Sequence, residues 1–384
     1  MSKTHIITMD VLEWAKNYQG PKFHAILTDP PYNLDSIKKR FGKASSKPAK
    51  EGRDGAFTRI GRGFMGKAWD TDVAFDPEVW YAIGEHLYPG AFGLAYMGSR
   101  TYHRCAVAIE EAGFIIHPMI GWIQAQGLPK ATRVDIQVDK REGVESERVP
   151  AAGRWSDSES ETYHWNKGTG YGVGKYMKKV ATSDLGKEWE GYMYGLQSLK
   201  PCLEPIIMFQ KPYENTPVDD MLDSGAGALN IEATKFSVGR EIITNRFTNG
   251  MKPFGNAVGE EYASSVSDLL YPANVILYGD VGEPFENFFY NAKVTKKEKN
   301  LGLDEPNMHP TVKPIQLNKY LALLLLPPSI YAPRRLLVPF AGTASEMIGG
   351  LQAGWDEIVG IELEKESAIV ARKRIEYWSN DAQA

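Results

Sequence analysis

The chain has 384 residues, 43% hydrophobic and 24% charged, which is typical of a globular protein with one large or two ordinary domains. No apolar run is long enough to span a bilayer, the first ten residues do not resemble a signal peptide, and two cysteines give no disulfide framework or metal spacing. A net charge of −4 argues against a protein that binds nucleic acid over its whole surface.

The first 123 residues alternate between predicted strands and helices. We expect strands at 5–8, 24–28, 91–97 and 114–123, and helices at 11–18, 77–87 and 101–112. This alternation predicts a parallel sheet covered on both faces.

A basic segment interrupts this pattern. Residues 33–68 are polar and Gly-rich and predict a long loop, and the stretch 22–67 carries eleven Lys or Arg against four acids. Such a cluster suits a phosphate-contacting patch, and it equally suits a solvated loop.

The pattern breaks at residue 124, and apart from a strand near 204–210 it stays irregular to residue 305. An α/β pattern then returns, with helices at 314–326, 343–353 and 365–378 and strands at 335–340 and 357–361. We therefore expect one α/β sheet built by residues 1–123 and 306–384, with the region 124–305 inserted between them. Open sheets bind ligands beyond the carboxyl ends of their strands, which points to Asp29 and Phe340.

Asp29, Pro30, Pro31 and Tyr32 follow a predicted strand directly. An exocyclic amine on a nucleobase is a poor nucleophile because its lone pair is delocalised into the ring. The Asp29 carboxylate and the Pro30 carbonyl could accept the two N–H bonds and aim that lone pair, while the prolines stiffen the turn. Tyr32 offers a flat face on which an extruded base could stack.

Two further segments could hold a cofactor. In Val338–Ser345 a strand leads into a helix, so that Phe340, Gly342, Thr343 and Ser345 surround a helix N-terminus, and Glu362 ends the next strand where it could bind ribose hydroxyls. In His309–Pro314, Thr311 and Lys313 could reach a carboxylate, although Thr311 is also a suitable helix cap.

Asp-Pro-Pro-Tyr, His-Pro-Thr-x-Lys-Pro and Phe-x-Gly, in this order, resemble the motif set of the amino-methylating DNA methyltransferases of the β group. Further segments resemble phage and prokaryotic site-specific members, namely 64–70, 98–104, Leu199-Lys200-Pro201 with Glu204-Pro205, and 288–290 with 292–293. The resemblance covers nearly the whole chain.

The resemblance implies a Rossmann-like S-adenosylmethionine-dependent sheet in circular order, with the catalytic half first. It also implies S-adenosyl-L-methionine as cofactor and direct in-line transfer to a flipped base. By position Asp10 matches the acid that contacts the cofactor's adenine, and Trp122 a position often aromatic beside the flipped base, although a buried core tryptophan fits it equally. Val338 and Ala344 depart from the family's Asp and second Gly, and alanine suits that position only where its φ is negative.

The resemblance places target recognition within residues 124–305 and implies double-stranded DNA as the partner. It also implies a prokaryotic or phage-infected cytoplasm, and it is compatible with a homodimer and with a separate cognate restriction endonuclease. Lysines interleaved with aromatic residues suit groove contacts there. The residues that we expect to contact DNA are Lys38, Lys39, Arg40, Arg59, Arg62, Trp122, Lys175, Lys178 and Lys179.

An Asp at the first motif position resembles enzymes that act on the 6-amino group of adenine, whereas Ser is commoner in those that act on the 4-amino group of cytosine. One alternative is thus a DNA methyltransferase that acts on cytosine. The others are a methyltransferase for RNA or a protein glutamine amide, and a DNA-binding protein without catalytic activity.

Overall fold

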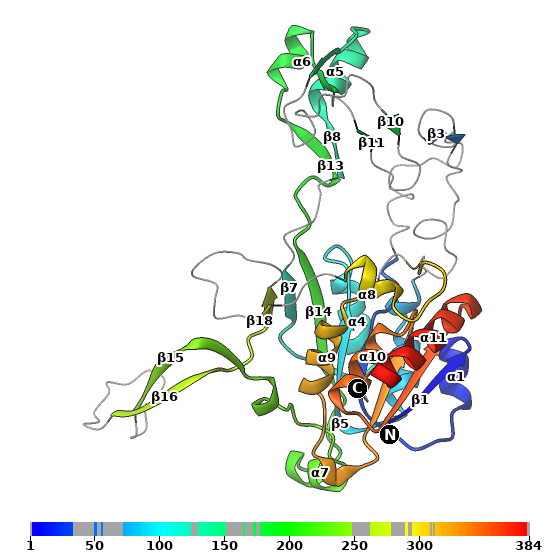
Figure 1. The fold of residues 1–384 in the computed structure, drawn as a ribbon, viewed down its shortest axis with the longest axis vertical. Coiled ribbons are helices and arrows are strands. Elements are labelled where there is room, and N and C mark those ends of the chain that lie inside the picture. The colour runs from blue at the N-terminus through cyan, green and yellow to red at the C-terminus, as the bar shows by residue number, and fades with distance from the viewer. Residues whose placement is uncertain are drawn as a thin grey trace. The chain divides into compact units, whose positions relative to one another are not determined.

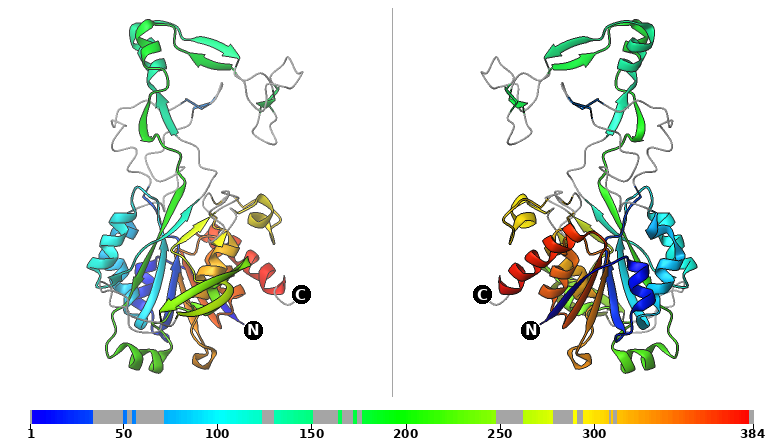
Figure 2. Two further views of the ribbon diagram at one scale, coloured as in Figure 1. Left: turned by 90° about the vertical axis from the view of Figure 1, so that its left-hand side faces the viewer. Right: turned by 90° about the vertical axis from the view of Figure 1, so that its right-hand side faces the viewer.

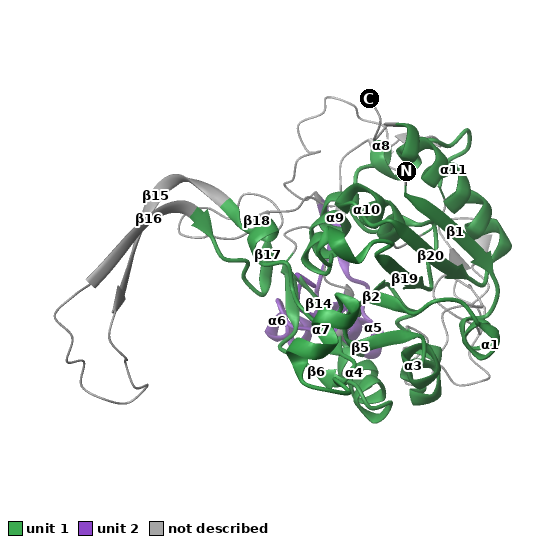
Figure 3. Cartoon of the chain, turned by 90° about the horizontal axis from the view of Figure 1, so that it is seen from below, with its two compact units in different colours: residues 1–125, 203–384 green, residues 126–202 purple. Residues whose placement is uncertain are grey.

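The computed structural model describes residues 2–33, 50–51, 55–56, 72–123, 130–150, 164–165, 172–173, 177–247, 262–277, 289–290, 294–307, 309 and 312–381. The chain forms two compact units, one made of residues 1–125 and 203–384 and the other of residues 126–202 (Figure 3). These bounds differ from the expected inserted region, 124–305, whose role in target recognition stays a prediction.

Both ends of the chain build one sheet in the first unit (Figure 1). Its strands follow the order β1 (Lys3–Thr8), β20 (Glu357–Glu362), β19 (Arg335–Pro339), β2 (Phe23–Thr28), β5 (Leu87–Tyr96), β14 (Leu203–Gln210), β7 (Ile120–Ile123), β17 (Val275–Leu277) and β18 (Phe289–Tyr290), with β6 (Ile115–Ile116) paired to β14. Since β2 and β19 are parallel neighbours, the chain segments after residues 28 and 339 leave the same edge of the sheet.

Helices cover both faces of this sheet (Figure 2). Within β2, Phe23 and Ile26 pack toward α1 (Val11–Asn17), α3 (Pro77–Gly84) and α4 (Tyr102–Glu111). Ala25 and Leu27 pack toward the opposite layer, which consists of α9 (Ile315–Leu324), α10 (Ser345–Ala353) and α11 (Lys365–Asp381). A strand buried on both faces needs an unbroken apolar run, which explains the sequence of residues 23–28.

The expected parallel pairing is found from β1 to β5, and β14 adds an antiparallel strand that pairs with β5, β6 and β7. The expectation of an irregular stretch after residue 212 is wrong. It holds α7 (Pro217–Ser224), the antiparallel pair β15 (Phe236–Phe247) and β16 (Tyr262–Leu270), and α8 (Lys296–Asn300). The expected strand 114–123 is split into β6 and β7.

Short elements complete the described chain. The antiparallel pairs are β3 (Lys50–Glu51) with β4 (Gly55–Ala56) and β10 (His164–Trp165) with β11 (Gly172–Val173), and the 3₁₀ turns are Val73–Phe75, Glu232–Thr234 and Ser329–Tyr331. No helix in the described ranges has the length and apolarity to cross a membrane.

The second unit contains regular structure where the sequence showed no sustained period. Its elements are β8 (Lys130–Arg133), α5 (Val134–Glu142), β9 (Glu147–Pro150), β12 (Met177–Val180), α6 (Asp184–Glu188) and β13 (Met193–Gln197), with β8 paired to β13 and β9 to β12.

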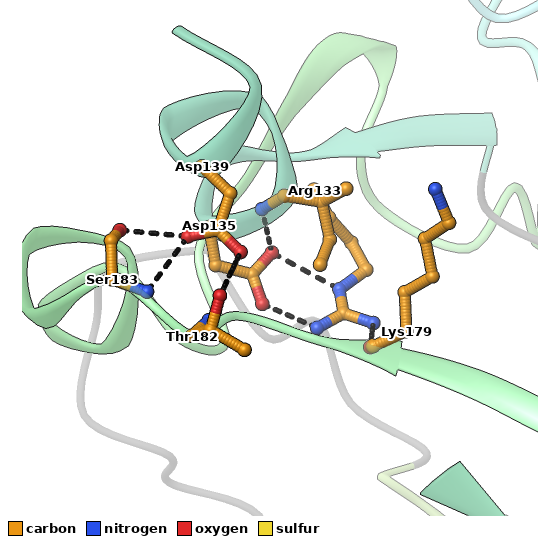
Figure 4. A network of polar contacts seen from close by, with 7 residues as sticks. Arg133, Asp135, Asp139, Lys179, Thr182 and Ser183 are labelled. Atoms are coloured by element: carbon orange, nitrogen blue, oxygen red, sulfur yellow. Dashed lines mark hydrogen bonds and ion pairs between the residues drawn. The ribbon is translucent and has the colours of Figure 1, made fainter. Parts of the chain in front are cut away.

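Buried carboxylates explain why apolar periodicity missed α5. Asp139 accepts hydrogen bonds from Ser183 Oγ at 2.7 Å and from the Thr182 backbone N–H at 3.0 Å, and these bonds hold its pKa at about 2 (Figure 4). Asp135 is ion-paired with Arg133, whose guanidinium also donates to the Lys179 carbonyl at 2.6 Å. The inward face of α5 is therefore acidic.

The close packing of α9 on α10 makes a test of the first unit. A Cβ added to Gly349 would lie 2.4 Å from Asn318 Cβ and 2.6 Å from the Asn318 carbonyl carbon. We expect Gly349→Ala to lower the free energy of unfolding by about 1–3 kcal/mol, because the helices must separate. Urea unfolding measures this change, and an unfolding midpoint equal to that of the wild type would contradict the observed packing.

Candidate active site

Asp29 stands where the central strand β2 leaves the sheet, and two buried prolines follow it. Thr101, at the start of α4, donates its hydroxyl to the Tyr32 carbonyl at 3.1 Å. The Asp29–Tyr32 turn is thus fixed by proline stiffness and by a bond to a separate element.

The ammonium of Lys313 joins three groups at this turn. Its Nζ lies 2.6 Å from Asp29 Oδ2, 3.0 Å from the Tyr32 hydroxyl and 3.1 Å from Glu204 Oε1. Tyr32 in turn donates its hydroxyl to Glu204 Oε1 at 2.7 Å. These three contacts match the three N–H bonds of an ammonium. We call Asp29, Tyr32, Glu204 and Lys313 the carboxylate–lysine cluster.

Burial and charge set the ionisation of this cluster. Burial raises the pKa of Asp29, the Glu204 carboxylate raises it further, and the Lys313 ammonium opposes both. Burial would lower the pKa of Lys313, but the carboxylates of Asp29 and Glu204 raise it above its usual value. Burial and the same two carboxylates raise the pKa of Tyr32 well above 10. Lys313 is therefore charged and Tyr32 is a neutral phenol at physiological pH.

Two buried polar atoms beside the cluster have no hydrogen-bond partner among the described residues, Asp29 Oδ1 and Trp122 Nε1. Trp122 lies directly opposite Glu204 in the antiparallel pair of β7 with β14, so both side chains leave the same face of the sheet. Asp29 Oδ1 is thus an unpaired acceptor, and Trp122 Nε1 an unpaired donor, within the described part of the chain.

A second polar layer, which sequence patterns did not identify, lies behind the cluster. The buried Tyr96 hydroxyl donates to Asn318 Oδ1 at 2.8 Å, and Asn318 Nδ2 donates to Glu346 Oε1 at 3.3 Å. Burial, followed by the Asp29 charge, raises the pKa of Glu346 to about 7. The apolar pattern of α9 and α10 concealed these polar residues on their inward faces.

The loop after β19 is held by Glu362, as its predicted position at a strand end suggests. Glu362 accepts from the backbone N–H of Gly342 at 2.7 Å and of Glu364 at 2.8 Å. Phe340, Gly342 and Ala344 have φ values of 56°, 51° and 68°. The negative φ under which alanine would suit position 344 is not observed, and a left-handed non-glycine residue costs about 1–2 kcal/mol.

The hydroxyls of Thr343 and Ser345 support this loop from within. The buried guanidinium of Arg374 donates to the Thr343 carbonyl at 2.5 Å, to the Thr343 hydroxyl at 3.0 Å and to the Ser345 hydroxyl at 3.3 Å. Asn307 also donates to the Thr343 hydroxyl, at 3.2 Å. A loop that must keep a strained backbone gains rigidity from these bonds.

Asp10 and His309 flank the loop. The Met9 N–H bonds to the Glu362 carbonyl at 3.0 Å, and Asp10 caps α1 by accepting from the Leu12 and Glu13 N–H groups at 2.9 and 3.1 Å. A Cβ on Gly342 would lie 3.5 Å from His309 Nε2, so this ring borders the glycine. The carboxyl ends of β1, β19 and β20 thus bring Asp10, Gly342 and Glu362 to one edge.

The predicted site residues are only partly placed. Lys313 contacts Asp29 and Glu204, and Trp122 is buried. Lys178 and Lys179 are exposed on β12 of the second unit. Seven predicted residues lie outside the described ranges, namely Thr311, Lys38, Lys39, Arg40, Arg59, Arg62 and Lys175.

The ionisation of Glu362 gives a pH test. Burial raises its pKa from 4.5 to about 7. Because the folded-state pKa is raised, the wild type loses stability as the pH rises from about 4.5 through about 7, by on the order of 3 kcal/mol. We expect Glu362→Gln to lack this decline. Glu346 also makes the stability depend on pH, but it does so in both proteins, so its contribution cancels in the comparison. Urea unfolding of both proteins between pH 4.5 and 8 measures it, and parallel curves would contradict the assigned ionisation.

Comparison with known proteins gives one relative of known class. No protein-family model matches the chain. It is similar to the Type II methyltransferase M.HindIII of Haemophilus influenzae, with 22% identity over 244 residues, which cover 59% of this chain and 64% of the relative. The chain thus spans less than two thirds of that relative's length.

Two solved structures overlap with nearly the whole chain at low TM-scores. The M1.HpyAVI–SAM complex covers 97% of this chain and 99% of its own at 14% identity and a TM-score of 0.42, and the cytosine-N4-specific PvuII DNA methyltransferase covers 100% and 92% at 10% and 0.43. Both TM-scores are below 0.5. The sequence relative is named a type II methyltransferase, and the motifs of this chain resemble those of methyltransferases.

Proposed function

We propose that the protein is an S-adenosylmethionine-dependent DNA methyltransferase that modifies the 6-amino group of adenine. The observation that carries this proposal is the state of Asp29. One of its oxygens is held by the Lys313 ammonium, and the other is buried and has no partner among the described residues. Leaving a buried acceptor unpaired is costly, and a ligand N–H group would satisfy it.

The amine would be oriented by the turn after β2. Asp29 Oδ1 and the Pro30 carbonyl would each accept one N–H bond, so that the lone pair leaves conjugation with the ring. Tyr32 would stack on the base, since its hydroxyl is fixed by Glu204 and Lys313. Lys313 favours ionised Asp29, which can then accept a hydrogen bond and take the proton that the methylated amine releases.

The loop after β19 fits S-adenosylmethionine. The Glu362 carboxylate lies at a strand end, where it would hold ribose hydroxyls, Asp10 would contact the adenine ring, and Gly342 leaves the backbone open beside His309. Phe340, Thr343 and Ser345 shape the loop, and Thr311 belongs to the same proposed site. The bound cofactor would supply an electrophilic methyl group for in-line transfer to the amine.

Double-stranded DNA is the proposed partner, in a prokaryotic or phage-infected cytoplasm. Reaching an amine inside a duplex requires that the base be flipped out, at a cost of a few kcal/mol. Lys178 and Lys179 would contact phosphates through the second unit, and the basic residues of the 33–68 segment would add to this attraction. A homodimer and a cognate restriction endonuclease belong to the same proposal.

Replacing Asp29 tests the assigned role directly. We expect Asp29→Ala to lower kcat by about 10²–10³ or more, because the acceptor oxygen Asp29 Oδ1, which would orient the amine, is lost. The Kd of S-adenosylmethionine, measured by calorimetry, should change little, since the cofactor residues lie on other strands. Transfer of a labelled methyl group to DNA measures kcat. Turnover at the wild-type rate by a folded variant would overturn the role of Asp29.

The DNA contacts have their own test. We expect Lys178→Ala/Lys179→Ala to weaken DNA binding and to reduce the slope of log Kobs against log salt concentration by about 2, one for each lost phosphate contact. The matched control is Lys16→Ala/Lys373→Ala, because both of these exposed lysines are paired with carboxylates, Glu78 and Asp304. Fluorescence anisotropy at several salt concentrations measures the slopes. Equal slopes in the two double variants would remove these lysines from the DNA contact.

A further inference from the structure

Glu204 reaches the carboxylate–lysine cluster from the antiparallel strand β14, far along the chain from Asp29. The backbone fixes its place, because the Pro205 carbonyl accepts from the Met97 N–H at 3.0 Å and Glu204 itself pairs with Trp122 of β7. Its side chain is 19% exposed. A carboxylate so far removed from water requires strong partners.

Glu204 Oε1 serves two partners at once, the Tyr32 hydroxyl at 2.7 Å and the Lys313 ammonium at 3.1 Å. Without this oxygen, one ammonium N–H bond and the phenol O–H bond would both lose their acceptor. Lys313 is a donor at the Tyr32 hydroxyl, so the phenol O–H bond must point to a carboxylate, Glu204 at 2.7 Å or the neighbouring Asp29. Glu204 therefore helps to set the orientation of the Tyr32 ring.

We propose that Glu204 is a positioning residue of the methyl-transfer site, whose carboxylate holds the Tyr32 ring and the Lys313 ammonium in place beside Asp29. This inference rests on the proposed function. It places a second carboxylate beside Asp29 and Lys313. That carboxylate lies at the end of the sheet where a cationic methyl donor would react, and it would favour the positive charge that develops on the amine.

The pH dependence of turnover distinguishes this role from simple packing. Within the described chain, the titratable groups that act on Asp29 are Tyr32, Tyr96, Glu204, Lys313 and Glu346. The Glu204 charge raises the pKa of both Asp29 and Lys313. Removing that charge should therefore move the acid limb of the rate profile, which reports Asp29, toward lower pH.

The experiment compares Glu204→Gln with wild type and with Glu357→Gln. Glu357 is a matched control, because it is also an ion-paired glutamate, 22% exposed, but it pairs with Arg335 at the opposite end of the sheet. Single-turnover methyl transfer to DNA is measured from pH 5 to 10. We expect Glu204→Gln to lower the rate roughly 10- to 100-fold, as small misplacements at a reacting centre do. The acid limb should shift to lower pH, with the Kd of S-adenosylmethionine within about twofold of wild type.

The control should keep the acid limb at its wild-type position. An acid limb and a rate of Glu204→Gln that match those of Glu357→Gln would overturn the inference while leaving the proposed function intact. Should Glu204→Gln fail to fold, Glu204→Asp keeps the charge at a shorter reach, and we expect a wild-type acid limb with a lower rate. An unchanged rate in that variant would overturn the inference, and a wild type that methylates no DNA would overturn the proposed function together with it.

Discussion

The buried ammonium of Lys313 is the interaction on which the site depends. It connects the turn after β2, the start of β14 and the segment before α9. Lys313 and Asp29 lie 284 residues apart along the chain, and Tyr32 and Glu204 lie 172 residues apart. Removing one member of a buried charged group costs about 3–5 kcal/mol, because the remaining charge loses its partner. The same ammonium opposes the burial that raises the pKa of Asp29.

The sheet order brings this cluster next to the second functional loop. Because β19 lies between β20 and β2, the loop that begins at Phe340 and the turn that begins at Asp29 leave neighbouring parallel strands at one edge. Behind that edge, Arg374 and Glu346 form a buried polar layer that connects α10 and α11 to the loop. Rigid supports of this kind let a strained backbone at Phe340 and Ala344 persist.

Sequence patterns predicted the site residues that stand at strand ends, and they missed the residue pairs that only long-range contacts bring together. Asp29 and Glu362 were predictable, because each directly follows or ends an apolar run that a buried strand requires. The ion pair of Lys313 with Glu204 was not predictable, since no local sequence pattern connects the loop before a helix with a distant antiparallel strand. The helix α5 was missed because its buried side chains are Asp135 and Asp139. The left-handed φ of Ala344 could not be predicted, because alanine rarely adopts this conformation.

The most direct test of the proposed activity is chemical. The purified protein would be incubated with unmethylated DNA of varied sequence and S-adenosylmethionine, the DNA digested to nucleosides, and the products analysed by mass spectrometry. We predict 6-methyladenine, with no such product from protein that carries Asp29→Ala. A 4-methylcytosine product would contradict the choice of base and keep the chemistry of the site, and the absence of any modified nucleoside would contradict the proposed function.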